Sequence, residues 1–249
     1  MTAKIATALV PLLCGMIFAA SSHAAVATAP PPSAPAVACP SGKCRDAPEH
    51  AKLTAPDGRH EIDIDFASAP YVSDGAIVVF PGETLVFRFS GGDGGPGTPS
   101  FEKQMPLALP QNIPPSDASF KDDEHTRVQH DPKTGENLYV IKEGSPFAEG
   151  GTAQEHLKDE PPNTMIVSYH QVNGHPDMVL RIEHNFSSAL KYDAEIEPLR
   201  SGGRASPVDT STCPVMPVLS GTETWPYPLG AITLKNFRFL DTGKGFNCD

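Results

Sequence analysis

The chain has 249 residues, 27 of them proline, and carries 19 Lys and Arg against 30 Asp and Glu, a formal net charge of -11 with His neutral. This acidic surplus disfavours nucleic acid as a partner, because phosphate binding needs an excess of basic side chains. Beyond residue 24, no segment supplies the roughly 18 apolar residues that a transmembrane helix requires. The composition therefore disfavours both nucleic-acid-binding and integral membrane proteins.

The N-terminus has the layout of a signal peptide. An early cation, Lys4, precedes an apolar run from Ile5 to Ala20, and small residues stand at Ser22 and Ala24, the two positions that a signal peptidase reads. We therefore expect cleavage after Ala24, which removes residues 1–24. The mature protein is predicted to be soluble and either periplasmic or secreted.

Four cysteines lie beyond the predicted signal peptide, and an even number in an oxidising compartment is typical of structural disulfides. Three pairings are possible. We expect Cys39 to pair with Cys44 around a short turn, and Cys213 to pair with Cys248. A redox or zinc site at the first pair is disfavoured, because no second Cys or His pair stands nearby.

The first part of the mature chain divides into a tether and a β region. Residues 25–58 are rich in Ala and Pro, which favours an extended conformation over a packed core. Glu61–Phe66 alternates apolar with acidic residues, and Ala76–Phe80 and Thr84–Phe89 look like neighbouring strands around a Pro-Gly turn. The sequence therefore predicts a first β lobe over residues 59–101.

Residues 102–163 are predicted to form an acidic, loop-rich insertion. They carry 12 Asp and Glu against 6 Lys and Arg, and only Leu138–Lys142 has the pattern of a strand. Loops of this length are either functional or partly disordered.

A second β lobe is predicted over residues 164–249. Strand patterns at Thr164–His170, Met178–His184 and Ala189–Ile196 indicate an antiparallel meander. Leu229–Leu240 has the pattern of a strand pair or of one bent strand.

Many short strands with few helical periods predict a mostly β protein, an antiparallel β-sandwich. The run Ile77–Phe87 resembles the strand, Pro-Gly turn and strand unit of cupredoxins and bacterial immunoglobulin-like domains. Val179–Ala194 is similar to immunoglobulin-like hairpins of exported bacterial proteins. The resemblance covers a small part of the chain and implies an immunoglobulin-like or cupredoxin-like sandwich. One sandwich with an insertion and two lobes both remain open, and we expect two lobes.

Several histidines are candidate metal ligands. The copper site of a cupredoxin needs a His after its Cys, and no His follows His184, so the resemblance implies the fold without that site. Two other His pairs share a spacing of five residues, and a Met follows the second pair. These candidate ligands for copper or zinc are His125, His130, His170, His175 and Met178. Calcium is the other metal considered, through the acidic residues Asp122, Asp123, Glu124 and Asp131.

The chain contains no nucleophile elbow, EF-hand or phosphate-binding loop, and no cofactor motif. The leading hypothesis is a non-enzymatic binding or scaffold protein of the cell envelope, with an envelope protein or a glycan as its partner. The alternatives are a periplasmic protein that binds copper, zinc or calcium, and a hydrolase with a site assembled from loops.

Overall fold

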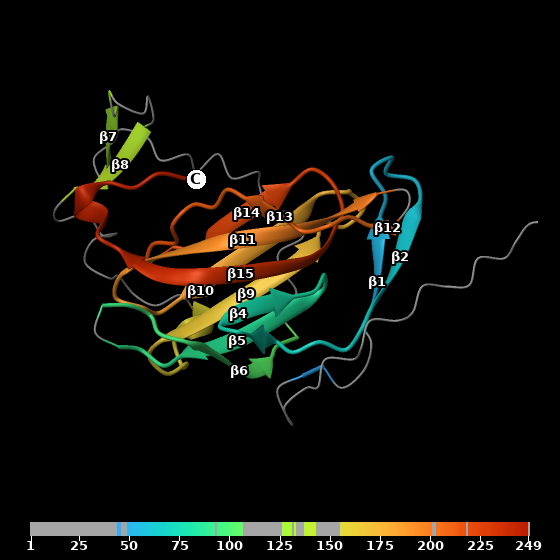
Figure 1. Ribbon diagram of the computed structural model, residues 1–249, viewed down its shortest axis with the longest axis horizontal. Coiled ribbons are helices and arrows are strands. Elements are labelled where there is room, and N and C mark those ends of the chain that lie inside the picture. The colour runs from blue at the N-terminus through green and yellow to red at the C-terminus, as the bar shows by residue number, and fades with distance from the viewer. Residues whose placement is uncertain are drawn as a thin grey trace, which may run out of the picture. The chain divides into compact units, whose positions relative to one another are not determined.

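The protein is an antiparallel β-sandwich, as the strand pattern predicts. The computed structural model describes residues 44–45, 49–92, 94–106, 126–130, 132, 137–142, 155–200, 203–217 and 219–248. All of them belong to one compact unit, residues 36–249. Two sheets are layered face to face (Figure 1), and the helical structure in the described residues consists of two short 3-10 turns, η1 (Glu155–Leu157) and η2 (Thr242–Lys244).

One layer is a five-stranded sheet. Its spatial order is β14 (Gly221–Trp225), β10 (Met178–His184), β9 (Thr164–Gln171), β5 (Glu83–Phe89) and β6 (Pro99–Gln104). The other layer is a six-stranded sheet with the order β12 (Gly203–Arg204), β11 (Ala189–Arg200), β15 (Leu229–Leu240), β4 (Ala76–Val79) and β3 (Val72–Ser73), and with β13 (Val208–Thr210) paired to β11.

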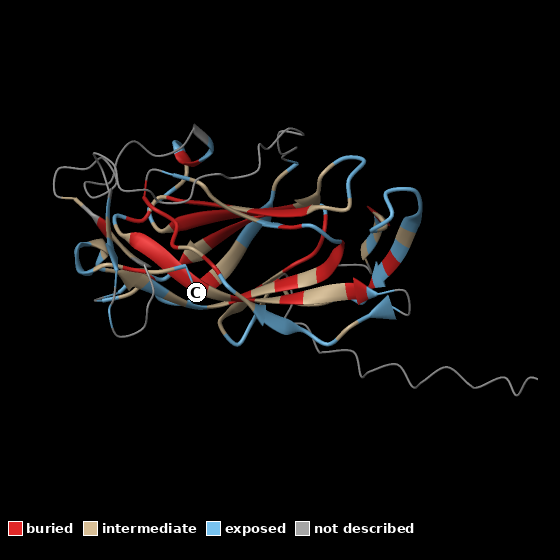
Figure 2. Cartoon of the chain, turned by 90° about the horizontal axis from the view of Figure 1, so that it is seen from above, coloured by how far each residue is buried: buried red, intermediate tan, exposed pale blue. Residues whose placement is uncertain are grey.

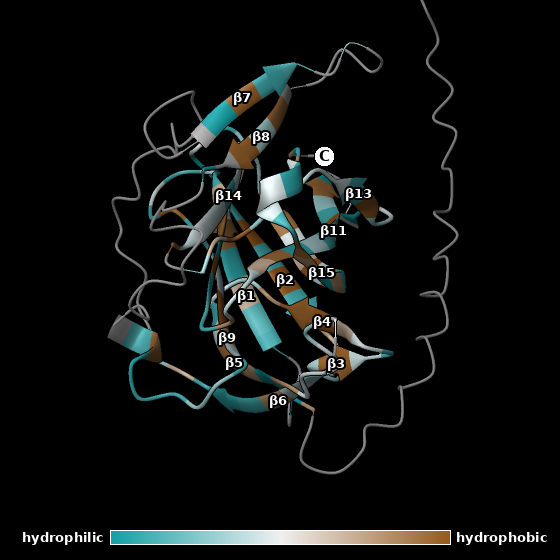
Figure 3. Ribbon diagram, turned by 90° about the vertical axis from the view of Figure 1, so that its left-hand side faces the viewer, coloured by the Kyte–Doolittle hydropathy of each residue, from teal (hydrophilic) through white to brown (hydrophobic). Residues whose placement is uncertain are grey.

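Two separate hairpins complete the described structure. Hairpin β1–β2, made of Glu49–Thr54 and Glu61–Phe66, lies at one end of the sandwich. In Figure 3, β1 is mainly hydrophilic, whereas β2 alternates between hydrophilic and hydrophobic residues. The other hairpin, β7 (Thr126–His130) with β8 (Asn137–Ile141), is joined to the end of the chain by mutual backbone hydrogen bonds between Tyr139 and Phe246. Most of the predicted insertion 102–163 lies outside the described residues.

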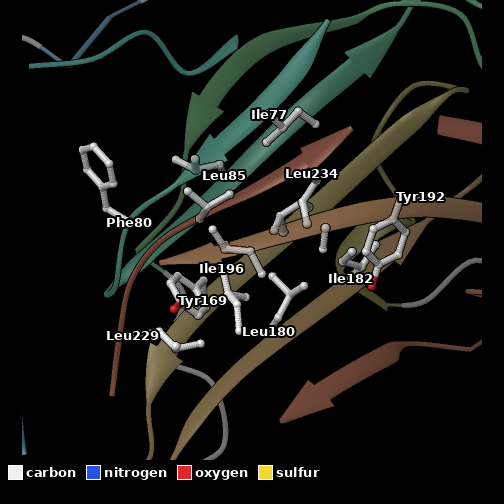
Figure 4. Close-up of a cluster of buried hydrophobic side chains, with 14 of the residues drawn as sticks. Ile77, Phe80, Leu85, Tyr169, Leu180, Ile182, Tyr192, Ile196, Leu229 and Leu234 are labelled. Carbon is white, nitrogen blue, oxygen red and sulfur yellow. The ribbon is translucent and has the colours of Figure 1, made fainter. Parts of the chain in front are cut away.

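One large hydrophobic core is shared by the two sheets, and Figure 2 shows that much of their length is buried. Side chains from both layers point into it, as Figure 4 shows for Leu85 and Leu180 of one sheet and Ile77 and Leu234 of the other. All four are fully buried. A fully buried aliphatic side chain contributes roughly 1.5–3 kcal/mol relative to an exposed one, so this shared core is the main source of stability.

The strands of the two predicted lobes are interleaved in both sheets. β5 pairs with β9 from Glu83 opposite Tyr169 onward, and β4 pairs with β15 through Ile77 opposite Leu234. Residues 59–101 and 164–249 therefore share both sheets and one core. Of the two organisations that the sequence leaves open, one sandwich is the one observed.

Two pairs of strands that the sequence predicts to be neighbours lie in opposite sheets. β4 and β5 flank the predicted Pro-Gly turn, but Pro81–Gly82 leads from one layer to the other, with Gly82 at a φ of 93°. Similarly, β10 and β11 do not form a meander, because β11 pairs with β15 across Ala194 and Leu234. Turn residues in the sequence show where the chain changes direction. Pairing with distant strands decides to which sheet the next strand belongs.

Candidate functional site

A cleft of about 450 Å³ lies between hairpin β1–β2 and the turn that follows β9. We call it the hairpin cleft. One wall is β1 from His50 to Thr54, together with Glu61 of β2. The other walls are the Pro81–Gly82 turn and the segment His170–Gly174, so three parts of the chain far apart in sequence meet there.

The side chain of Gln171 holds the hairpin against the sheet. Its Oε1 accepts a hydrogen bond from the backbone N–H of Thr54 at 2.5 Å, and its Nε2 donates to the backbone oxygen of the same residue at 2.9 Å. Nε2 also donates to the oxygen of Pro176 at 3.2 Å. The amide of Gln171 thus fills the position that a neighbouring peptide group would take in a sheet, and it fixes one end of the cleft.

A buried ion pair fixes the wall formed by the Pro81–Gly82 turn. The guanidinium of Arg45 donates to both carboxylate oxygens of Glu83, at 2.6 and 2.5 Å, and both side chains are 1% exposed. Glu83 also accepts from the N–H of Phe80 at 2.6 Å, and the N–H of Gly82 donates to the oxygen of Tyr169 at 2.7 Å. The turn is therefore held from both sides.

Arg45 is further enclosed by aromatic rings and backbone oxygens. Its guanidinium carbon lies 4.4 Å from the ring centre of Tyr71 and 3.9 Å from that of Phe80. The same group donates to the backbone oxygens of Ala69, Pro70 and Val78 at 3.2, 3.3 and 2.9 Å. Such complete pairing offsets the desolvation of a buried charge, which otherwise costs several kcal/mol, on the order of the net stability of a domain.

The outer face of the hairpin carries exposed charges. Nδ1 and Nε2 of His50 lie 2.8 Å from Asp65 and 3.3 Å from Asp63, and the hydrogen bond to Asp65 raises the pKa of the imidazole. Nζ of Lys52 lies 3.6 Å from Oε2 of Glu61. Exposed pairs of this kind are screened by water and salt and contribute little to stability.

Comparisons with known proteins do not place the chain in a family. No model of a known protein family matches it, and no curated protein or solved structure is significantly similar to it. In the part of the chain that the structure describes, no helix is long and apolar enough to cross a membrane.

The predicted metal ligands are distributed over different environments. His170 lines the hairpin cleft, and burial lowers its pKa. His175 lies in the turn that follows, where its N–H donates to the oxygen of Val172 at 3.0 Å. His130 ends β7, whereas His125 lies outside the described residues. Met178 is fully buried in the core.

Over the described ranges, no three His, Cys, Asp or Glu residues are grouped closely enough to hold a metal ion. The candidate calcium ligands Asp122, Asp123, Glu124 and Asp131 lie outside those ranges. A metal site therefore stays a prediction.

The predicted disulfide between Cys213 and Cys248 is present, with an S–S distance of 2.10 Å. Cys44 is also disulfide-bonded. Its predicted partner, Cys39, lies outside the described residues, so that pairing stays a prediction.

A second cleft, of about 530 Å³, lies beside η2 and is lined by Ser187, Ser188 and Asp241 among others. Its one carboxylate is already engaged: Asp241 accepts from the N–H of Gly243 at 3.2 Å and lies 3.0 Å from Nζ of Lys244. The hairpin cleft, with imidazole, amide and ammonium groups beside apolar Leu53 and Val172, offers a more varied set of contacts.

The hairpin cleft is lined mainly by hydrogen-bonding groups. The polar groups that it offers are hydrogen-bond donors and acceptors, such as Lys52, Glu61 and Asn173. This arrangement offers contacts to a polar or amphipathic partner.

Proposed function

We propose that the protein is an exported, non-enzymatic binding protein of the cell envelope, and that it holds its partner in the hairpin cleft. The signal-peptide pattern of residues 1–24 supports export. The observation that carries the binding function is the cleft itself, which is concave, mixed in polarity and about 450 Å³ in volume, within the usual range of ligand sites.

The walls of the cleft are preorganised. Gln171 fixes the hairpin, the Arg45–Glu83 pair fixes the Pro81–Gly82 turn, and Asp57 fixes the hairpin loop by accepting from the N–H groups of Arg59 and His60 at 2.9 and 3.1 Å. A rigid site loses little conformational entropy when its partner binds, which favours affinity. This rigidity supports recognition as the role of the cleft.

The test of cleft binding is calorimetric titration of the mature chain, from Ala25 onward, with a panel of extended peptides and of cell-envelope oligosaccharides. Asn173→Trp fills the mouth of the cleft from an exposed turn position and is expected to weaken binding by at least about tenfold. Asn173→Ala is the matched control, and Leu219→Trp adds an indole at an exposed residue outside the cleft lining. A ligand that binds both Trp variants equally well would move the site elsewhere.

Export is tested separately. Cell fractionation and N-terminal sequencing of the native protein are expected to find it outside the cytoplasm and beginning at Ala25. A cytoplasmic protein that retains Met1 would contradict the assignment to the envelope.

A further inference from the structure

The outer edge of β1 has main-chain groups that no strand in the described part of the chain covers. In an antiparallel pair, residues alternate between those that exchange backbone hydrogen bonds with the partner strand and those whose N–H and C=O point away from it. Thr54, opposite Glu61, is of the second kind, because its N–H and C=O are both bonded to Gln171. Lys52 and His50 follow at steps of two residues and therefore also point their backbone groups outward.

These outward groups line the hairpin cleft. Lys52 and His50 both belong to its wall, and neither makes a backbone hydrogen bond on that side with any residue that the structure describes. Two residues of a strand span about 7 Å, so the free N–H and C=O groups form two successive rungs beyond the rung that Gln171 occupies. An uncovered strand edge is a template for another strand.

We infer that the hairpin cleft binds an extended segment of a partner protein, which adds to β1 as a third strand and hydrogen-bonds to the backbones of Lys52 and His50. This inference rests on the proposed function and specifies its ligand. Gln171 marks where the added strand ends, because its amide already occupies the groups of Thr54.

The two faces of the added strand meet different surroundings. Residues that point inward face Val172, which is partly exposed, beside Leu53 and Pro81, which are already buried, so a small apolar side chain fits there. Residues that point outward continue the row of His50 and Lys52 on the exposed face of the hairpin. The partner segment therefore alternates apolar with polar residues.

Charge on the outward side chains contributes little selectivity. The nearer row of the hairpin is cationic through Lys52, and the next row, on β2, carries Glu61, Asp63 and Asp65. Asp63 and Asp65 lie two strand spacings away, about 10 Å, which is near the screening length at physiological ionic strength. Glu61 lines the cleft, but its carboxylate is paired with Nζ of Lys52 at 3.6 Å. Lys52 and Glu61 neutralise each other and the two aspartates are screened, so recognition depends mainly on the backbone and on the apolar positions.

The experiment selects heptapeptides from a random displayed library on the mature chain, with Asn173→Trp for counter-selection. The expected sequences alternate apolar with polar residues without a preferred charge. The best peptide is then methylated at one backbone nitrogen at a time. Methylation at alternate residues, whose N–H groups face β1, is expected to weaken binding about tenfold, whereas the residues between tolerate it.

Two variants of Lys52 test the edge of β1 directly. Lys52→Pro removes the outward N–H but none of the hydrogen bonds between β1 and β2, and it is expected to weaken peptide binding about tenfold. Lys52→Ala also removes the ammonium but keeps that N–H, so it is expected to weaken binding clearly less than Lys52→Pro, and the difference between the two variants reports on the N–H. Slower amide exchange of Lys52 and His50 in the complex gives a readout that does not depend on a variant's folding.

The outcomes separate this inference from the proposed function. If oligosaccharides bind, Asn173→Trp weakens that binding and the library yields no peptide, the cleft is still a binding site and strand addition is wrong. Selected peptides that tolerate methylation at every position would also overturn it. If neither class of ligand binds, both the ligand and the proposed function fail.

Discussion

The two ends of the sandwich are closed by different chemistry. At the hairpin end, side chains from distant segments hold backbone groups: Arg45 with Glu83 around one turn, and Gln171 with Thr54 at β1. At the other end, the covalent bond between Cys213 and Cys248 closes a segment of the chain on itself. Non-covalent closure depends on every partner being present, whereas a disulfide acts mainly by limiting the unfolded chain.

His184 belongs to the disulfide end and is completely buried. Its Nε2 donates to the oxygen of Val215 at 2.9 Å, and its Nδ1 accepts from the N–H of Phe186 at 3.3 Å. Both nitrogens are satisfied in the neutral ring. A second proton would place two N–H groups against each other, and burial lowers the pKa of the imidazole to about 4.

The largest expected effect is at the hairpin end. Glu83→Gln leaves the guanidinium of Arg45 buried without its counter-charge, so we expect a loss of about 3–5 kcal/mol in the free energy of unfolding, measured by urea titration. The double variant Arg45→Met with Glu83→Gln is expected to recover part of that loss, because it removes the unpaired charge. Glu61→Gln is the exposed control and should change stability by less than about 1 kcal/mol. Similar losses in the buried and exposed variants would refute the distinction.

The next effect is at the disulfide end. Replacing both Cys213 and Cys248 with Ser opens a loop of 35 residues, and we expect a loss of about 3–4 kcal/mol from the greater freedom of the unfolded chain. Chemical denaturation of the oxidised protein and of the double variant measures it. Ligand binding in the hairpin cleft should stay unchanged, which distinguishes this end from the other.

The two ends should also respond to pH in opposite directions. The pKa of His184 is lowered on folding, so its contribution to stability is complete above its unfolded pKa of about 6.5 and is lost as the pH falls toward 4. We expect a loss of about 2 kcal/mol between pH 7 and pH 5, and a flatter profile in His184→Gln. If the free energy of unfolding of His184→Gln falls equally steeply with pH, other groups cause the loss.

The pKa of the exposed His50 is raised on folding, mainly by its hydrogen bond to Asp65. Its contribution is therefore present at low pH and lost as the pH rises through the raised value. Comparing His50→Gln with the wild type across the same pH range is expected to show this reversed dependence on a smaller scale, because the pair is exposed.

A further effect concerns the attachment of the hairpin. Gln171→Ala removes the two hydrogen bonds to Thr54 and the one to Pro176, each of which contributes about 1 kcal/mol, so we expect a loss of about 2–3 kcal/mol. Amide exchange at Thr54 should accelerate, while exchange in β9 and β10 stays slow. Uniform acceleration over all three strands would show that Gln171 acts on the whole fold.

The strands with strict alternation were predictable from the sequence. Glu61–Phe66 and Met178–His184 are strands in the structure, and Leu229–Leu240 is one strand with an irregular register, as one of the two expectations had it. The predicted pairing of Cys213 with Cys248 is confirmed. The alternation within each segment is enough to predict these strands. The disulfide follows from the even number of cysteines together with the predicted export.

The hairpin cleft was not predictable in the same way. β1 falls within the predicted tether, because the Ala and Pro bias of residues 25–58 outweighs the alternation of Ala51 and Leu53 with polar neighbours. That alternation was the available signal. Arg45 and Glu83, 38 residues apart, show no local pattern that would pair them. The cleft depends on such distant contacts, and those are decided by the packing of the whole chain.

The interleaving of early and late strands has a consequence for the timing of folding. Ile77 of β4 finds its partner, Leu234 of β15, more than 150 residues later in the chain. A protein with such long-range pairing folds slowly, because a large loop must close before its contacts are gained. The six-stranded sheet stays incomplete until β15 is available for pairing. A chain that crosses a membrane unfolded would therefore have most of its length across before the sandwich could form.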